Sequence, residues 1–260
     1  MTAPRVYKTE AVVLKRFSLG EADRILTLYT PNLGKIRTIA RGVRRTKSRM
    51  GGHVELFTRS ALMLAHGQNL DVLTGAQTLD SFLPLRDDLQ RTSWALYVIE
   101  LIDQFTADNQ ENFPLYRLLI ETLHRLCDAP DGELVLRYFE LQLLRLAGYK
   151  PQLHRCTTCR ENLTPITNGF SPEAGGMLCP NCISPERAIR RLSPNALKVL
   201  RFLQNADYAG AMRLRLNKSL HGEVAGALRE YIRYYLEREP RSLSFLDTLR
   251  QEARPIPTRG

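Results

Sequence analysis

Two Cys-x-x-Cys pairs constrain this chain more than any other feature of its sequence. Nineteen residues separate the pair that ends at Cys159 from the pair that begins at Cys179. Each pair can form a turn that aims two sulfurs at one ion, and four thiolates complete a tetrahedral zinc site. Redox dithiols or two disulfides are the alternatives, although a redox pair normally stands alone in a βαβ unit. The spacing predicts one Zn²⁺ ion held by Cys156, Cys159, Cys179 and Cys182. Because four protein ligands leave no open coordination position, this zinc is expected to be structural and not catalytic.

The cellular compartment of the protein can be inferred from its first residues and from its apolar runs. The first five residues lack the apolar stretch of a signal peptide, and no later run reaches the roughly 18 apolar residues of a membrane span. We therefore expect a cytoplasmic protein without a membrane partner, in which thiols stay reduced and clustered cysteines bind metal. The fifth cysteine, Cys127, falls on an apolar helical face and is interpreted as a core residue.

The first eighty residues contain the short alternating runs that are typical of strands. Pro31-Asn32-Leu33-Gly34 and Gly67-Gln68-Asn69 lie between such runs and fit hairpin turns. Five short strands in succession predict a small barrel, and the five-stranded antiparallel OB-fold is a barrel that binds nucleic acid. We expect the strands near residues 7–17, 24–30, 35–41, 56–66 and 70–79.

After Pro84 the apolar period changes from two to 3.6, which predicts helices. Asp131 and Ser193 are expected N-caps, and the last helix is expected to stop before Pro240. Residues 151–192 lose this periodicity and contain the paired cysteines. The sequence thus predicts a multi-domain α+β protein, with an OB-fold barrel in residues 1–80 and a helical domain in residues 81–260. A four-cysteine zinc finger at residues 151–192 would interrupt the helical domain, and residues 254–260 would form a frayed tail.

Charge is distributed unevenly along the chain, whose formal net charge is +10. Residues 1–80 carry 13 basic and 6 acidic residues, residues 81–150 carry 7 and 11, and residues 151–260 carry 17 and 10. A basic head and tail around an acidic middle indicate that contact with a polyanion belongs to particular parts of the molecule.

The clearest basic run lies in the expected barrel, since no acidic residue occurs between Lys35 and Val54. Its cations occupy one strand and the loop that begins at Gly42, from which side chains can reach phosphates. A solvated surface is the ordinary explanation of a charge run, but its single sign and its place on an OB barrel favour nucleic-acid contact. The predicted nucleic-acid-binding residues are Lys35, Arg37, Arg41, Arg44, Arg45, Lys47 and Arg49.

Three aromatic residues near this run, Phe17, Tyr29 and Phe57, could stack on bases. At alternating positions of strands they are more simply explained as barrel core. We therefore expect them inside the barrel and predict no base-stacking residue.

Motifs of catalysis are absent from the chain. Gly34-Lys35 lacks the upstream glycine and the following Ser or Thr of a phosphate-binding loop, and no GxGxxG, HExxH or GxSxG occurs. The sequence therefore favours a nucleic-acid-binding protein that is not an enzyme. A metal-dependent nuclease built from non-contiguous acids and a zinc-containing transcriptional regulator stay open as alternatives.

Several short motifs occur together in the first domain. They are Val13-Leu14-Lys15, Gly20-Glu21-Ala22-Asp23, Leu28-Tyr29-Thr30, Gly34-Lys35, Ala40-Arg41-Gly42, Arg44-Arg45 and Ser48. In combination they resemble the RecO family of bacterial recombination and repair mediators. The expected architecture, an OB-fold followed by a helical domain with a four-cysteine zinc finger, is similar to that family over nearly the whole chain.

This resemblance implies a function that composition and spacing do not indicate. It implies a DNA repair and recombination mediator that binds single- and double-stranded DNA and anneals complementary strands. With RecR as partner, such a protein helps load RecA onto DNA coated by the single-stranded-DNA-binding protein (SSB). The resemblance further implies that the helical domain receives the C-terminal tail of SSB, without indicating which residues do so, and that the protein is associated with the nucleoid.

Overall fold

The computed structural model describes residues 6–184 and 189–252, and the chain forms two compact units, Met1–Asp128 and Ala129–Gly260. The expected tail at residues 254–260 lies outside the described residues. The units do not coincide with the expected domains 1–80 and 81–260. Because a compact unit need not be a domain, the boundary near residue 80 stays a prediction.

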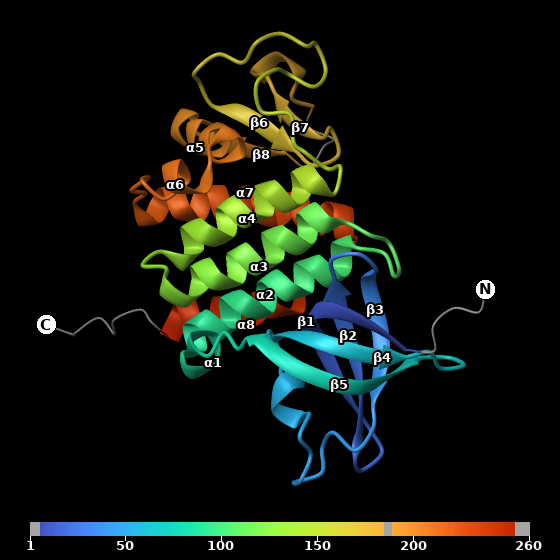
Figure 1. The fold of residues 1–260 in the computed structure, drawn as a ribbon. Helices are drawn as coiled ribbons and strands as arrows, with labels where there is room; N and C mark the ends of the chain where they lie inside the picture. The colour runs from blue at the N-terminus through green and yellow to red at the C-terminus, as the bar shows by residue number, and fades with distance from the viewer. Residues whose placement is uncertain (1–5, 185–188, 253–260) are drawn as a thin grey trace, which may run out of the picture. The chain divides into compact units, whose positions relative to one another are not determined.

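The first unit contains a closed five-stranded barrel with the strand order β1-β2-β3-β5-β4, shown in blue to cyan in Figure 1. All neighbouring pairs are antiparallel except β3–β5. An odd number of strands cannot close into a ring with every pair antiparallel, so one parallel pair is required. The predicted OB-fold is confirmed, and its strands are β1 (Val6–Leu19), β2 (Asp23–Thr30), β3 (Gly34–Ala40), β4 (Arg59–Ala65) and β5 (Asp71–Asp80).

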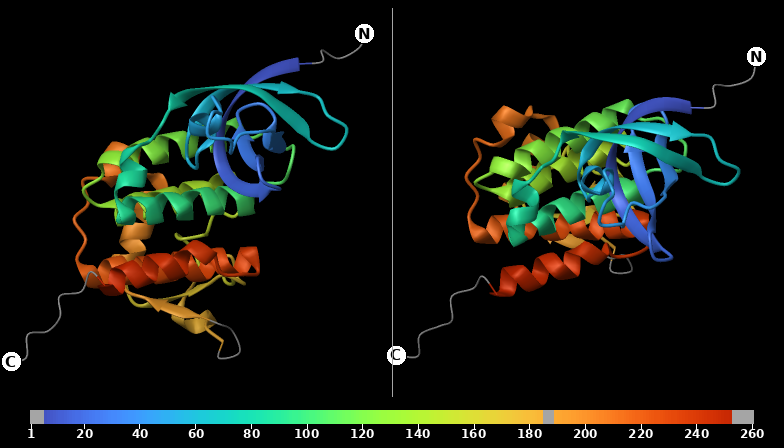
Figure 2. Two further views of the ribbon diagram at one scale, coloured as in Figure 1. Left: turned by 90° about the horizontal axis from the view of Figure 1, so that it is seen from below. Right: turned by 60° about the horizontal axis from the view of Figure 1, so that its bottom comes forward.

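Turn chemistry determines how β2 connects to β3. The Thr30 hydroxyl accepts a hydrogen bond from the Leu33 N–H at 3.0 Å and donates one to the Gly34 carbonyl at 2.9 Å. Gly34 has a φ of +64°, and a Cβ at this position would lie 2.0 Å from the carbonyl oxygen of Gln110. Glycine is therefore required at position 34 both by the backbone conformation and by the close approach of the Gln110 carbonyl. The second hairpin, β4–β5, projects from the barrel (Figure 2).

The barrel has its own apolar core, which comes from the alternation of side chains along each strand. Leu26 and Leu28 of β2 point inward, and so do Ile36 and Ala40 of β3. Further members of this cluster are Ala11, Val13, Val43, Val54, Leu62, Leu64 and Leu73. The intervening residues point outward.

Helices complete both units. The first unit adds α1 (Pro84–Asp87), α2 (Leu89–Phe105) and α3 (Phe113–Asp128). The second contains α4 (Gly132–Leu146), α5 (Pro194–Asn205), α6 (Tyr208–Ala211), α7 (Lys218–Leu236) and α8 (Arg241–Glu252). The predicted caps are confirmed, because Asp131 accepts the Leu134 N–H at 2.9 Å and Ser193 accepts the Ala196 N–H at 3.2 Å. Within the described parts of the chain, no helix combines the length and apolar character that crossing a bilayer demands.

Two features of the second unit differ from the expectations. The helix that ends at Leu236 is not the last one, since α8 follows Pro240 and buries Leu243 and Leu246. Proline stops one helix but does not prevent the next from starting directly after it. Residues 151–192, where the helical period is lost, contain a three-stranded sheet that the sequence does not predict, formed by β6 (Asn168–Ser171), β7 (Gly176–Leu178) and β8 (Arg190–Leu192). These strands are too short for a visible alternation.

Candidate metal centre and nucleic-acid interface

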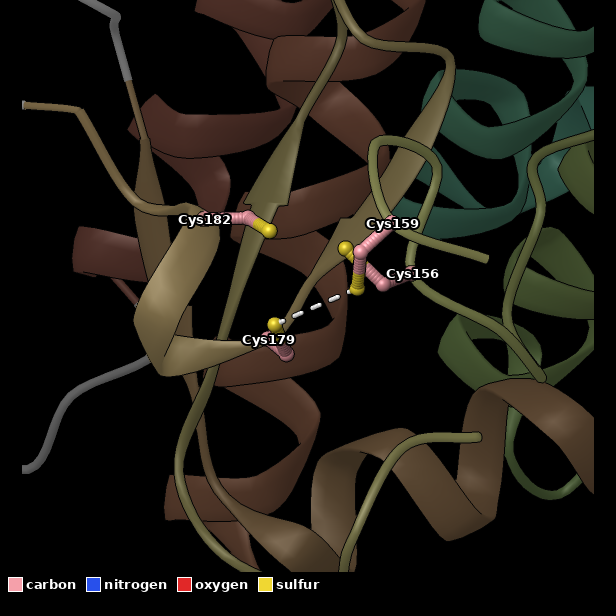
Figure 3. A group of neighbouring side chains, drawn as sticks. All are labelled: Cys156, Cys159, Cys179 and Cys182. Carbon is pink, nitrogen blue, oxygen red and sulfur yellow. Dashed lines mark hydrogen bonds between the residues drawn. The ribbon is translucent and has the colours of Figure 1, made fainter. Parts of the chain in front are cut away.

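The four paired cysteines lie together at one end of the small sheet. Their Sγ atoms all lie within 4.8 Å of one another, and Figure 3 shows the four sulfurs pointing into a common space. The Sγ atoms of Cys159 and Cys179 are 3.8 Å apart. A tetrahedron with metal–sulfur bonds of about 2.3 Å has sulfurs roughly 3.8 Å apart, so this separation is that of two ligands of one ion. The cluster can therefore bind a metal ion.

Local backbone hydrogen bonds aim each pair of sulfurs. After the first pair, the Arg160 N–H donates to the Cys156 carbonyl at 3.0 Å, and Arg160 takes a left-handed conformation with a φ of 67°. At the second pair, the Cys182 N–H donates to the Cys179 carbonyl at 3.0 Å within the short 3-10 helix η2 (Pro180–Cys182). Both Cys-x-x-Cys segments are thus closed turns, as the spacing predicts.

The protonation of the thiols depends on what surrounds each sulfur. Burial opposes ionisation of Cys156, but the backbone N–H groups of Cys179, Cys159 and Thr158 outweigh it and lower the pKa of this thiol to about 6. The neighbouring sulfurs of Cys179 and Cys159 raise the pKa of Cys182 to about 12. Four sulfurs this close cannot all ionise without a compensating cation, and a divalent metal supplies that charge.

We use the name cysteine module for residues 151–184 and 189–192. The sheet of the module contacts the module's first residues through the backbone, because the Met177 N–H donates to the Gln152 carbonyl at 2.9 Å. Gly176 permits this approach, since a Cβ there would lie 2.2 Å from the same carbonyl oxygen. Phe170 of β6 is completely buried and stacks on Tyr231 of α7, with ring centroids 5.3 Å apart. The module is therefore attached to α7 by an aromatic pair.

Cys127 is separate from this cluster. Its Sγ donates to the Leu123 carbonyl one helical turn earlier, at 3.4 Å, and burial raises the pKa of the thiol. All five cysteines are free of disulfides. Of the residues that the structure describes, the four paired cysteines form the only group of three or more side chains with metal-ligand atoms within reach of one ion.

The predicted nucleic-acid-binding residues fall into an exposed set and one sequestered residue. We use the name basic loop for residues 41–49, which leave the end of β3. Arg37 projects from the outer face of β3 with 60% of its side chain exposed. Together with it, the exposed set comprises Arg41, Arg44, Arg45, Lys47 and Arg49.

Lys35 differs from the other six residues. Only 12% of its side chain is exposed, and its Nζ donates to the carbonyl oxygen of Asp103 at 2.6 Å. The carboxylates of Asp103 and Asp108 lie 3.4 and 3.5 Å away. Lys35 is therefore part of an ion-pair cluster with the end of α2 and the segment after it. The alternation of residues along β3 could not reveal these partners, because Asp103 and Asp108 are distant from Lys35 in sequence.

The basic loop is held against the turn between β1 and β2. The Gly42 N–H donates to the Asp23 carboxylate at 2.7 Å, and the Arg44 N–H donates to the Ala22 carbonyl at 2.9 Å. The Arg44 guanidinium also donates to the Gly20 carbonyl at 3.0 Å. Val43 of the loop is buried in the barrel core. The start of the basic loop is therefore fixed beside the turn between β1 and β2, and its arginine and lysine side chains are exposed there.

The three aromatic residues near the basic run do not share one environment. Tyr29 and Phe57 are buried, as expected. Phe17 is 54% exposed, so its assignment to the barrel core is wrong. The physical reason is a register shift in β1 between Val13 and Lys15, which turns the later odd-numbered residues outward. A single sequence gives no signal for such a bulge.

A second group of basic residues lies on β8, within the cysteine module. Arg190 pairs with Glu230 of α7, whereas Arg191 is exposed. Both line a cavity of about 1150 Å³, together with Tyr234 and Arg238. Arg187, which the sequence places in the same group, lies outside the described residues.

Comparison with known proteins agrees with this architecture. Residues 1–82 match the family model described as recombination protein O N terminal, and residues 86–244 match recombination protein O C terminal. The chain is 44% identical over 249 residues to a DNA repair protein RecO of Dehalococcoides mccartyi strain 195, covering 96% of this chain and 98% of the relative. It is 45% identical to a DNA repair protein RecO of Roseiflexus sp. strain RS-1, covering 96% and 88%. A third relative with the same name, from Desulforamulus reducens, is 35% identical over 94% of this chain and 95% of its own length. The chain therefore belongs to the RecO family of recombination and DNA repair proteins.

Proposed function

We propose that this protein is a DNA repair and recombination mediator that binds single- and double-stranded DNA through the exposed cations of its barrel. The observation that carries this proposal is the exposed set on β3 and the basic loop. Six cations, Arg37, Arg41, Arg44, Arg45, Lys47 and Arg49, are exposed over fewer than fifteen residues of an OB-fold. Contacts of this kind neutralise phosphates and depend little on base sequence.

In this proposal the cysteine module binds one Zn²⁺ ion with a structural role. The 3.8 Å separation of two sulfurs and the all-thiolate ligand set fit zinc in a tetrahedral site. Because four cysteines fill the coordination sphere, the metal would stabilise the module and would not activate water.

Family membership supports a proposal about the partners of this mediator. The protein would anneal complementary strands without hydrolysing a nucleotide. With RecR it would help load RecA onto single-stranded DNA that is coated by SSB, whose C-terminal tail would bind the helical part of the chain. Cations on DNA-binding surfaces reduce the repulsion between two approaching strands, which is the physical requirement for annealing.

Salt dependence tests the placement of the DNA surface. Each phosphate contact that is lost should reduce the slope of log affinity against log salt concentration by about 0.7 to 0.9. Arg44→Ala with Arg45→Ala should therefore flatten the slope by up to about 1.8 and weaken binding to all sequences alike. The measurement is fluorescence anisotropy of labelled oligonucleotides at several salt concentrations. Thermal stability should change little, since exposed loop side chains contribute little to folding.

The matched control is Arg191→Ala, which removes an exposed arginine of the cysteine module. This variant should keep the affinity and the salt slope of the unchanged protein. If Arg191→Ala abolishes binding while the Arg44 and Arg45 double variant changes neither quantity, the DNA surface lies on the module and not on the barrel.

A further inference from the structure

We propose that Phe17, on the outer face of β1, is a stacking platform for an unpaired base and gives the barrel a preference for single-stranded DNA. This inference rests on the proposed DNA-binding function and adds a ligand group to it. The cations of the barrel account for contact with phosphates. Phe17 would account for contact with the bases.

The strand register places Phe17 in an apolar row across three strands. Phe17 of β1 lies opposite Ile25 of β2, and Ile25 lies opposite Ile39 of β3. Neighbouring residues on each strand, such as Leu26 and Ala40, belong to the barrel core, so the row faces outward. Ile25 and Ile39 are half-buried, whereas 54% of the surface of Phe17 is exposed.

Cations border this row on the same face. Two residues before Ile39 on the chain lies Arg37, with 60% of its side chain exposed, and two residues after it lies the exposed Arg41. Two acidic residues near these cations already have partners, since the Asp108 carboxylate lies 3.8 Å from the Arg37 guanidinium and the Asp23 carboxylate accepts the Gly42 N–H at 2.7 Å. An apolar row between cations is complementary to a strand that presents bases to the middle and phosphates to the edge.

The occupant is therefore a nucleic acid with unpaired bases. In a duplex, both faces of each base are already stacked and the apolar row would have no base to contact. The outer face of strands β2 and β3 is also where OB-folds in general bind oligonucleotides. An aromatic side chain that is exposed at this position loses contact with water when a base covers it, which favours binding.

The test is Phe17→Ala, measured with a poly-dT oligonucleotide and with a duplex of the same length. Removing a stacking aromatic should lower affinity for the single strand by about tenfold, and affinity for the duplex should stay unchanged. Phe17→Trp should retain affinity for the single strand, because a larger ring stacks at least as well. The salt slope should not change in either variant, which separates the loss of stacking from a loss of phosphate contacts.

Phe113→Ala is the matched control, since Phe113 is 50% exposed at the start of α3 and is not a member of this row. It should leave both affinities unchanged. Equal loss of single-strand and duplex binding in Phe17→Ala, or no loss of either, would overturn the inference and leave the proposed function standing. Absence of DNA binding by the unchanged protein would overturn the proposed function, and this inference with it.

Discussion

The barrel and the cysteine module contain strands of very different length, and they reach stability in different ways. Strands of the barrel have 7 to 14 residues and close around a continuous apolar cluster. Strands of the module have 3 or 4 residues, and its two turns converge on four sulfurs. Long strands bury enough alternating side chains to offset the loss of chain entropy, whereas a small segment needs a cross-link or a metal.

This difference has a consequence for function. The proposed DNA surface belongs to the barrel, whose core contains no residue of the metal cluster. Loss of a metal bound by the module would therefore have no direct effect on the cations that would contact DNA. Four perturbations examine this independence, beginning with the largest expected effect.

Removal of the metal should affect the module alone. Structural zinc contributes about 10 to 16 kcal/mol to the folding of zinc-finger peptides, so Cys179→Ser or a strong chelator should unfold the module. Elemental analysis should give one zinc per chain in the unchanged protein and none in the variant. Hydrogen exchange should then lose protection in residues 151–184 and keep it in the barrel strands. A module that stays protected without metal would show that its packing on α7 is sufficient.

The reciprocal change is Leu28→Ala in the barrel core. Leu28 is fully buried in the apolar cluster, and truncation of such a side chain costs about 2 to 5 kcal/mol. Unfolding by denaturant should show this loss, while the zinc content stays at one per chain. Loss of zinc from the Leu28→Ala variant would mean that the two regions do not fold independently.

A smaller effect is expected from Gly176→Ala within the module. Gly176 has a φ of +154°, and a Cβ would lie 2.2 Å from the Gln152 carbonyl oxygen. The strained conformation costs about 1 to 2 kcal/mol, and the contact with Gln152 adds to it. The control is Gly222→Ala in α7, where nothing lies within 4 Å of the added Cβ. This control should be neutral or stabilise the helix by up to about 1 kcal/mol. The measurement is the thermal unfolding midpoint of both variants, which should be lower for Gly176→Ala than for Gly222→Ala. Equal midpoints would contradict the prediction.

The comparison also explains which parts of the structure could be predicted from the sequence. Alternation over long strands identified all five strands of the barrel, and the spacing of the cysteines identified a cluster that the structure brings together. Both signals are local or depend on residue types with one dominant chemistry. The sequence does not predict the strands of the module, because an alternation of apolar and polar residues cannot be recognised over three or four positions.

One prediction about a single residue is wrong, and another residue has a partner that the sequence does not reveal. Regular alternation predicts Phe17 in the core, but a bulge in β1 reverses the side that later residues face. Lys35 stays a predicted nucleic-acid-binding residue, and its partner Asp103 is far away in sequence. The pattern predicted where cations occur along the chain, and tertiary contacts decide which of them are free to bind a phosphate.

The smallest expected effect concerns acid and the helix that begins the second unit. Asp131 caps α4 through the Leu134 N–H and lies 3.2 Å from His221, whose hydrogen bond holds the pKa of this carboxyl below its usual value. A lowered pKa contributes stability at pH above about 4, the unfolded value, and this contribution is lost as pH falls through the folded pKa. Since 40% of the Asp131 side chain is exposed, the contribution should be less than about 1 kcal/mol.

Asp131→Asn isolates this contribution, because asparagine caps a helix as well as aspartate does but carries no charge. Above pH 4 the variant should be slightly less stable than the unchanged protein, and the difference should vanish as the pH falls through the lowered pKa of Asp131. Acid would also protonate the thiolates and release a metal bound by the cysteine module, so absolute stabilities would mix two effects. Such a metal would be lost equally from both proteins, however, and the difference between their unfolding free energies reports Asp131 alone. A difference that stays constant from pH 7 to pH 3 would show that the carboxylate contributes only as a cap, and that the acid sensitivity of the second unit comes from its metal site.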